Sequence, residues 1–486
     1  MTTRILIVSL TAACVLLVAG AVIDPSFVAG HLSKDGELER ATIAKILTLR
    51  LMATSLGALL GIVSVWLYWP TAGKYLLLPL LATYFLVVHS VYINPKYPTN
   101  TFLQSGTFAK FWDVLLGQDL FLTDFEPKSL LRTKKHEILQ ARYPVINVHV
   151  HFTYWLEKLS LEEMINIMDE CRVAMAVDLD GWPPGETADR IKAVRTKYRG
   201  RFMELHHVWF PEGEIDESFM TNKIARFEKA VQAGARGLKI WRNLGLKTTD
   251  LSGKVIPVDD PRLDALWTKA GELEVPVLIH VGDPDATFLP IDRFNERFEQ
   301  LREKNDRLGL GSSYVGPGFP AKTAILQQFE NIVRKHPNTI FIGAHMAELA
   351  EDLQHLSSLL DRYPNLYVDI SAQAAELGRQ PYTSRQFFIR YQDRLLFGTD
   401  GNPRERDYRA YFRFLETADE YFDYPFSEVE TFGRWKIYGL FLPQEVLAKV
   451  YYKNATRLLR LKDQELAELL KLMEGSAREP RTRRSA

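Results

Sequence analysis

The first hundred residues of this sequence contain three long apolar stretches. They lie at residues 5–23, 51–69 and 75–93, and none of them contains an aspartate, glutamate, lysine or arginine. A helix needs about 20 mainly apolar residues to cross the hydrocarbon core of a bilayer. The pattern therefore predicts three transmembrane helices within residues 1–94, and hence a multi-pass integral membrane protein in contact with the lipid bilayer.

The lysines and arginines between these stretches predict the orientation of the helices, because such residues favour the cytoplasmic side. The second connection carries one of them and the first carries four: Lys34, Arg40, Lys45 and Arg50. Three crossings would then place everything beyond residue 93 on the cytoplasmic side. The alternative is a cleaved signal peptide with small residues at 19–21, which would leave the rest of the chain facing outward.

From residue 145 onward, short apolar runs alternate with helix-like segments such as Leu161–Arg172 and Ala347–Arg362. This alternation is typical of a parallel α/β sheet, and eight strand–helix units over about 300 residues match a (β/α)₈ TIM barrel. An open, doubly wound sheet is the alternative, but no glycine-rich phosphate-binding turn follows the first run. The eight predicted strands are 145–151, 173–180, 202–210, 236–241, 275–282, 339–345, 366–371 and 395–400.

The predicted fold is therefore an α/β TIM barrel at residues 143–461, preceded by an all-α segment of three transmembrane helices at 1–94. Residues 95–142 are polar and aromatic with several prolines, and they are predicted to form a linker. Beyond the barrel, leucines at helical spacing predict a last helix within 462–486, followed by a basic, disordered tail. The pattern does not indicate an oligomeric state.

Composition narrows the chemistry of the barrel. The 60 basic and 60 acidic residues cancel, so no overall field favours a nucleic-acid partner and none is predicted. The two cysteines, Cys14 and Cys171, are too few for a disulfide framework or a thiolate zinc site. Any metal ion must therefore be bound by nitrogen and oxygen ligands.

Metal-binding or titratable side chains end five of the eight predicted strands. In the first strand, His149 and His151 are two residues apart, so they share one face while Val148 and Val150 occupy the other. Taken alone, His280 could be an ordinary core histidine and Asp400 could cap a turn. Because barrel enzymes carry their chemistry at the carboxyl ends of the strands, we expect all of them to meet at one rim. The remaining four are Lys239, His280, His345 and Asp400.

In this order the strand-end residues resemble the amidohydrolase superfamily. The nearest branch is the amidohydrolase-related group typified by aminocarboxymuconate-semialdehyde decarboxylase, and the resemblance covers roughly residues 143–461. A lysine on the fourth strand departs from the pattern of that branch. The segments that carry the resemblance are VINVHVH at 145–151, FIGAH at 341–345, LFGTD at 396–400 and NATRLL at 454–459.

The resemblance implies a site for one divalent ion, zinc by preference, with His345 beside it as acid, base or carbonyl-polarising group. Asp400 would both bind the ion and accept a proton from the attacking water. In two-metal members of the superfamily a fourth-strand lysine is carbamylated and bridges the ions, so Lys239 with His345 is the alternative arrangement, with a second ion. The implied ligands of the single ion are His149, His151, His280 and Asp400.

Three functions follow as hypotheses. The first is a membrane-anchored hydrolase that activates water to attack an amide, lactone or related carbonyl. The second is a non-oxidative decarboxylase of an unsaturated or aromatic acid, and the third is a non-catalytic membrane scaffold. The expected partner in the first two is a small carbonyl compound or carboxylic acid. The expected substrate-pocket residues are Trp241, Arg242 and Arg404.

Overall fold

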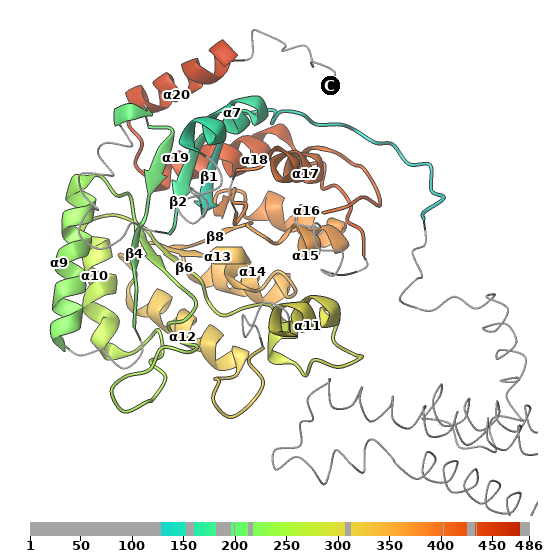
Figure 1. The fold of residues 1–486 in the computed structure, drawn as a ribbon. Coiled ribbons are helices and arrows are strands. Elements are labelled where there is room, and N and C mark those ends of the chain that lie inside the picture. Colours follow the sequence, from blue (N-terminus) through green and yellow to red (C-terminus); the bar gives the residue numbers. More distant parts are fainter. Residues whose placement is uncertain are drawn as a thin grey trace, which may run out of the picture. The chain divides into compact units, whose positions relative to one another are not determined.

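The structure is a computed structural model. It describes residues 128–151, 160–180, 196–198, 200–211, 217–306, 313–401, 403–424, 433 and 435–476. These residues belong almost entirely to a compact unit, Leu131–Ala486, whose strands are surrounded by helices (Figure 1). The predicted domain boundaries remain predictions.

Within the described ranges, the named strands all pair in parallel. One sheet has the order β1-β2-β3 and the other the order β4-β5-β6-β7-β8-β9. The strands are β1 (Val145–Val150), β2 (Val173–Asp178), β3 (Phe202–Glu204), β4 (His206–Val208), β5 (Leu238–Ile240), β6 (Val277–Ile279), β7 (Phe341–Gly343), β8 (Leu366–Asp369) and β9 (Leu395–Leu396).

The two sheets join into one barrel of eight strand positions. At one junction, β3 and β4 are a single run interrupted at Leu205, whose N–H donates to β2 at Asp178 O, while His206 N–H donates to Gly237 O before β5. At the other junction, Val148 N–H donates to Phe397 O at 2.9 Å and Asp400 N–H donates to His149 O at 2.9 Å. The eight predicted strands and the TIM-barrel-like fold are thereby confirmed.

Helices cover the outside of the barrel, and α9 and α10 lie together beside β4 in Figure 1. Two cores result: interior side chains such as Val148, Leu278 and Ile342 pack together, and a larger cluster lies between strands and helices. The helices are α7 (Leu161–Cys171), α9 (Glu217–Ala233), α10 (Asp264–Glu272), α11 (Phe298–Asp306), α12 (Lys322–Lys335), α13 (Ala344–Ala347), α14 (Leu353–Arg362), α15 (Ala374–Arg379), α16 (Pro381–Arg390), α17 (Glu405–Glu416), α18 (Gln444–Ala448), α19 (Asn454–Leu458) and α20 (Asp463–Ser476), with a π-helical turn, η6 (Lys449–Lys453), between α18 and α19.

Local sequence explains where α7 begins and ends. Ser160 caps its first turn through a hydroxyl that accepts from Glu163 N–H, and the Glu163 carboxylate accepts from Ser160 N–H. This capping box satisfies amide groups that a helix start leaves unpaired. Met164, Met168 and Cys171 form the buried face, so the predicted helical spacing is confirmed here.

The predicted helix from Ala347 to Arg362 is shorter than expected. It begins only at Leu353, where Asp352 accepts a capping hydrogen bond from His355 N–H. The residues before it form a turn of opposite hand, because His345, Met346, Ala347 and Glu348 all have φ between 54° and 59°. A left-handed conformation costs an L-residue roughly 1–2 kcal/mol, so this turn stores strain directly after β7.

The predicted membrane region is corrected by the structure. Along the part of the chain that the structure describes, no helix has the length and apolar character needed to cross a bilayer. The prediction of a multi-pass integral membrane protein in contact with lipid is therefore wrong on this finding. The three apolar stretches and their connections lie outside the described residues, as does the predicted basic tail from residue 477 onward.

Candidate metal centre

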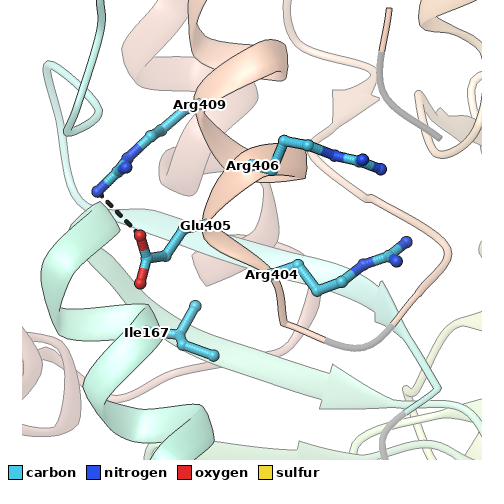
Figure 2. A pocket seen from close by; sticks show the side chains of 5 residues that line it. All are labelled: Ile167, Arg404, Glu405, Arg406 and Arg409. Atoms are coloured by element: carbon cyan, nitrogen blue, oxygen red, sulfur yellow. Dashed lines mark ion pairs between the residues drawn. The ribbon is translucent and has the colours of Figure 1, made fainter. Parts of the chain in front are cut away.

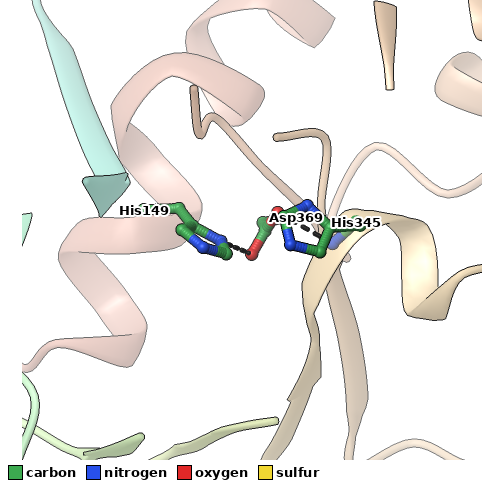
Figure 3. A group of neighbouring side chains, drawn as sticks. All are labelled: His149, His345 and Asp369. Atoms are coloured by element: carbon green, nitrogen blue, oxygen red, sulfur yellow. Dashed lines mark hydrogen bonds and ion pairs between the residues drawn. The ribbon is translucent and has the colours of Figure 1, made fainter. Parts of the chain in front are cut away.

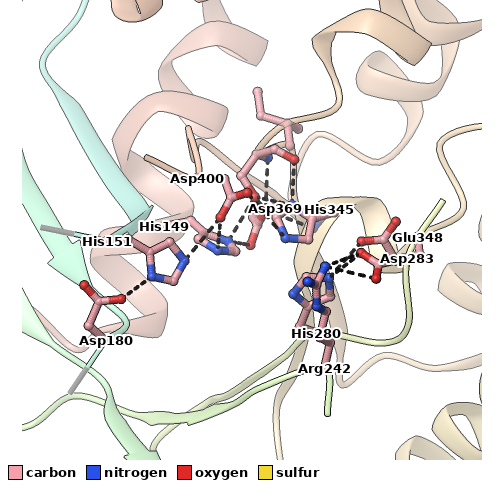
Figure 4. Close-up of polar contacts among 12 residues, drawn as sticks. His149, His151, Asp180, Arg242, His280, Asp283, His345, Glu348, Asp369 and Asp400 are labelled. Atoms are coloured by element: carbon pink, nitrogen blue, oxygen red, sulfur yellow. Dashed lines mark hydrogen bonds and ion pairs between the residues drawn. The ribbon is translucent and has the colours of Figure 1, made fainter. Parts of the chain in front are cut away.

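His149 in β1, His151 directly after β1 and Asp400 in the segment that follows β9 form the first group at the carboxyl rim (Figure 4). Oδ1 of Asp400 lies 3.1 Å from His149 Nε2 and 3.2 Å from His151 Nε2. The strands that carry them are neighbours at the barrel closure, so residues far apart in sequence meet there. The structure thus brings together three of the four residues expected to bind one ion.

Alternation in β1 is less regular than the sequence predicts. The pairing of β1 with β2 shifts register between Asn147 and Val150, and Val148 packs inside the barrel whereas Val150 joins the outer core. The two valines therefore do not share a face. His149 and His151 nevertheless converge on the same carboxylate oxygen.

The two imidazoles of this group both direct Nε2 toward Asp400 Oδ1. Each Nδ1 faces a fixed acceptor: Asp369 Oδ2, at 2.9 Å, for His149, and Asp180 Oδ1 for His151. In His149, a proton held on Nδ1 leaves Nε2 with its lone pair, which is the state that binds a metal. His151, whose pKa is raised to about 9, must lose its Nε2 proton when an ion binds. His149 Nε2 is fully buried and has no hydrogen-bond partner in the described structure, despite lying 3.1 Å from Asp400. Buried donor atoms that converge without hydrogen bonding fit the ligand set of a divalent ion.

Asp369 and Ser371, at the end of β8, position two of the histidines (Figure 3 shows His149, His345 and Asp369). Asp369 accepts from His149 Nδ1, from His345 N–H at 3.1 Å and from Ser371 N–H at 3.0 Å. His345 Nδ1 in turn donates to Ser371 O at 2.9 Å. Burial disfavours the charge of Asp369, but His149 outweighs burial and holds the pKa of Asp369 below its usual range.

The charges around Asp400 favour its ionised form. Burial opposes ionisation, but His345, His149 and His151 together hold the pKa of Asp400 well below its usual range. For His151, burial lowers the pKa, and the contacts with Asp180 and Asp400 overcome it and raise the pKa to about 9. Asp400 also has φ 63°, a left-handed conformation that aspartate tolerates better than most residues.

A second group contains His280, His345 and Glu348. His280, expected to complete the first group, has Nε2 3.2 Å from Glu348 Oε1, and its ring centroid is 4.5 Å from that of His345. His345 lies between the groups, since its ring centroid is 4.8 Å from that of His149 and its Nε2 is 4.0 Å from Asp400 Oδ2. Burial lowers the pKa of His280 and raises that of Glu348.

Lys239 lies fully buried inside the barrel below these groups. Its Nζ has no hydrogen-bond partner in the described part of the chain. Burial lowers the pKa of Lys239 to about 8, and the nearby carboxylates of Asp369 and Asp400 partly offset that decrease. The lysine is thus a buried, weakly basic amine beside the first group, and its predicted place as a bridge between two ions remains a prediction.

Two of the expected pocket residues adjoin the histidines. The ring centroid of Trp241 lies 5.8 Å from that of His151 and 6.1 Å from that of His280. Arg242 Nη1 donates to both carboxylate oxygens of Asp283, at 2.8 and 3.0 Å, and its side chain is 27% exposed. An indole and an accessible guanidinium therefore lie against the groups that could hold metal.

Arg404 lies elsewhere. It lines a shallow pocket of about 520 Å³ at the start of α17, together with Ile167, Glu405, Arg406 and Arg409 (Figure 2). Its Nε pairs with Asp407 Oδ2 at 2.7 Å. The described lining of this pocket includes none of the histidines named above, so the expectation that Arg404 joins the substrate pocket finds no support in the geometry.

Two residues of the rim, Asp369 and Glu348, were not predicted from the sequence. Asp369 ends a predicted strand, which is a signal that could have singled it out. Glu348 reaches the histidines only through the left-handed turn, and a run of Met, Ala and Glu without glycine gives no sign of that backbone conformation.

A methyl group added at Gly398 would disturb the first group. A Cβ at this position would lie 2.9 Å from His149 Cβ and 3.0 Å from Ser371 Cβ, atoms that move only with the backbone. We expect Gly398→Ala to cost roughly 1–3 kcal/mol of stability and to weaken metal binding, as measured by denaturant unfolding and metal titration. Gly318→Ala is the control because nothing lies within 4 Å of its Cβ position; equal behaviour of both variants would contradict the expectation.

A parallel barrel with imidazoles and carboxylates gathered at its carboxyl rim is the architecture of metal-dependent barrel enzymes. The chain belongs to the amidohydrolase family, whose sequence model matches residues 208–461. It is thus a metal-dependent enzyme that uses a divalent ion, which excludes the non-catalytic scaffold. No curated protein matches the chain significantly.

Several solved structures are similar to the chain at low identity. The 2,6-dihydroxybenzoate decarboxylase from Rhizobium is 16% identical over 66% of this chain and 99% of its own, with a TM-score of 0.41. The dihydroxybenzoic acid decarboxylase from Polaromonas sp. JS666, solved with manganese and 2-nitroresorcinol, is 16% identical over 67% and 99%, with a TM-score of 0.42. A probable 2-pyrone-4,6-dicarboxylic acid hydrolase from Acinetobacter baumannii is 11% identical over 65% and 99%, with a TM-score of 0.37.

Proposed function

We propose that this enzyme hydrolyses an amide, lactone or related carbonyl compound by activating water at the first group. The ion, zinc by preference, would be held by His149, His151 and Asp400. Three protein ligands that leave coordination positions open are typical of catalytic rather than structural zinc. When bound, such an ion acts as a Lewis acid that polarises the carbonyl and makes water a stronger nucleophile.

The two oxygens of Asp400 carry this proposal. Oδ1 faces both β1 histidines, whereas Oδ2 faces His345 Nε2 at 4.0 Å. One oxygen can therefore bind the ion while the other accepts the proton of the attacking water. The ionised state of Asp400, which the surrounding histidines favour, is the state that a general base needs.

His345 is placed to complete the proton transfer. Its Nδ1 donates to Ser371 O, so Nε2 carries a lone pair that can receive a proton from Asp400 Oδ2 and pass it to the leaving group. Burial lowers the pKa of His345, which keeps the ring neutral and able to accept. Trp241 would shield the reacting carbonyl from bulk water on the side of His151.

Removal of the divalent ion tests the proposal most directly. Dialysis against a chelator should abolish hydrolysis of the amides and lactones in a substrate panel, because no described side chain replaces a Lewis acid at this position. Readdition of Zn²⁺ or Mn²⁺ should restore the rate, while circular dichroism stays unchanged. Hydrolysis that continues at full rate in metal-free protein would refute the proposal.

Decarboxylation of an unsaturated or aromatic acid is the second candidate. Trp241 offers a flat surface, and Arg242 offers N–H groups beyond the one that binds Asp283, so a planar carboxylate could bind between them. The products distinguish the two functions. Release of CO₂, with a solvent proton in place of the lost carboxylate and no water added elsewhere, would show that the enzyme is a decarboxylase and not a hydrolase.

A further inference from the structure

His207 lies on the inner face of the barrel, in register with Lys239 on the neighbouring strand. Leu205, two residues earlier, packs in the interior cluster, and side chains two residues apart along a strand share a face. By the same alternation, Trp209 and Trp241 follow one layer nearer the carboxyl rim. The ring centroid of His207 lies 6.1 Å from that of Trp209 and 6.3 Å from that of Trp241. An imidazole thus lies directly beside two indoles at this rim.

One ring nitrogen of His207 is hydrogen bonded and the other is not. Nδ1 lies 3.1 Å from Asp180 O, and a backbone carbonyl can only accept, so Nδ1 carries the proton. Burial lowers the pKa of His207 to about 4, which keeps the ring neutral near pH 7. Nε2 therefore has a lone pair, and this buried atom has no hydrogen-bond partner in the described structure. The amine of Lys239, on the neighbouring strand, does not donate to it.

The lone pair of Nε2 is not part of the metal centre. His207 belongs to none of the groups of described residues that could hold an ion. A buried acceptor without a donor is costly, and nearly all buried polar groups in folded proteins are paired. A ligand that enters beside the indoles can supply the missing donor.

Trp241 brings this acceptor close to the first group. Its ring contacts three histidine rings, with centroid distances of 5.8 Å to His151, 6.1 Å to His280 and 6.3 Å to His207. Asp180 links the acceptor to the first group, because its backbone oxygen accepts from His207 Nδ1 and its carboxylate accepts from His151 Nδ1. A planar substrate that lies on the indole with its carbonyl at the first group therefore has its neighbouring substituent beside His207.

We propose that His207 Nε2 accepts a hydrogen bond from the substrate, and that the preferred substrate carries an N–H or O–H group beside the carbonyl that is attacked. The inference rests on the proposed function, since it takes this carbonyl to lie at the first group. An amide with an N–H satisfies the acceptor, whereas an ester or lactone without a hydroxyl leaves it buried and unpaired. A site built to hydrogen-bond such a group discriminates against substrates that lack it.

Matched substrates test this assignment in the full-length, metal-loaded protein. The first pair is an amide with one N–H and its N-methylated counterpart, and the second is the ester of a 2-hydroxy acid and that of the matching 2-methoxy acid. The wild type should prefer the donor-bearing member of at least one pair by about tenfold in kcat/KM, the usual contribution of one uncharged hydrogen bond. The pair that shows this preference identifies the donor as N–H or O–H.

Variants of His207 separate the roles of its two ring nitrogens. In His207→Asn the side-chain amide can still donate to Asp180 O, but nothing replaces Nε2, so the preference should disappear while the metal content stays unchanged. In His207→Gln the amide oxygen takes the place of Nε2, and the preference should return in part. His206→Asn is the matched control, because His206 stacks on Phe227 outside the barrel, with ring centroids 6.0 Å apart, and it should keep the wild-type preference.

Equal kcat/KM within both pairs in the wild type would overturn the role of His207, and so would an unchanged preference in metal-loaded His207→Asn. Loss of metal from His207→Asn would also overturn it, and would make His207 a positioning residue that acts on His151 through Asp180. If His207→Asn fails to fold, the wild-type comparison and His207→Gln decide. The proposed function fails on a different observation, namely a metal-loaded wild type that hydrolyses no member of either pair and none of the other amides and lactones tested.

Discussion

Replacing Asp400 with asparagine is expected to lower kcat by about 10²–10⁴-fold, the usual contribution of a general base. The amide keeps the size of the side chain, and asparagine accepts the left-handed conformation that Asp400 adopts at φ 63°. What is lost is the negative charge that faces His149 and His151 and the oxygen that accepts a proton. Steady-state kinetics with a hydrolysed substrate would measure the effect.

Asp393→Asn is a suitable control for that variant. Asp393 is an exposed aspartate that pairs with Lys449 at 2.8 Å on the outside of the barrel, so its loss should leave kcat unchanged and stability within about 0.5 kcal/mol. If Asp400→Asn kept the wild-type kcat while binding metal normally, Asp400 could not be the proton acceptor, and the proposed mechanism would have to be abandoned.

Replacing Asp369 with alanine is expected to weaken metal binding about 10–100-fold, although Asp369 is not among the proposed ligands. The change removes the acceptor that fixes His149 Nδ1 and the acceptor for His345 N–H. Only the Ser371 hydroxyl, 2.9 Å from His149 Nδ1, then remains to hold the ring, which can rotate or exchange its tautomer more easily. Because a buried partner is also deleted, the free energy of unfolding should fall by about 3–5 kcal/mol.

Metal titration and denaturant unfolding, performed on the same preparation, would separate these two effects of Asp369→Ala. Asp361→Ala offers a comparison, since Asp361 is half exposed and pairs with Arg390 on the surface, and it should change neither quantity appreciably. Unaltered metal affinity in a folded Asp369→Ala protein would mean that His149 needs no fixed orientation to bind the ion.

The order of strands and the main residues of the rim were predictable from sequence, because both depend on simple periodicities. Short apolar runs mark the barrel strands, and His149, His151, His280, His345 and Asp400 follow from where those runs end. The division into two groups was not predictable. It depends on the direction of each ring, which is set by hydrogen bonds to Asp180, Asp369 and Ser371 and not by spacing along a strand.

The left-handed turn at residues 345–348 was the second feature that could not be predicted from the sequence. A helical pattern of leucines predicted a helix from Ala347, but four residues at the end of β7 adopt a left-handed turn, and Glu348 enters the site as a result. The membrane prediction failed for another reason. It rested on hydropathy alone, and the described helices are short and amphipathic, as in α14, where only Leu353, Leu356, Leu359 and Leu360 are buried.

Closure of the barrel between β1 and β9 has a consequence for biosynthesis. The ribosome releases His149 and His151 long before Asp400, and Phe397 must pair with Val148 before the aspartate can reach them. In the nascent chain, the first group is therefore incomplete until the last strand has docked. Binding of metal by the first group must therefore follow the docking of the last strand.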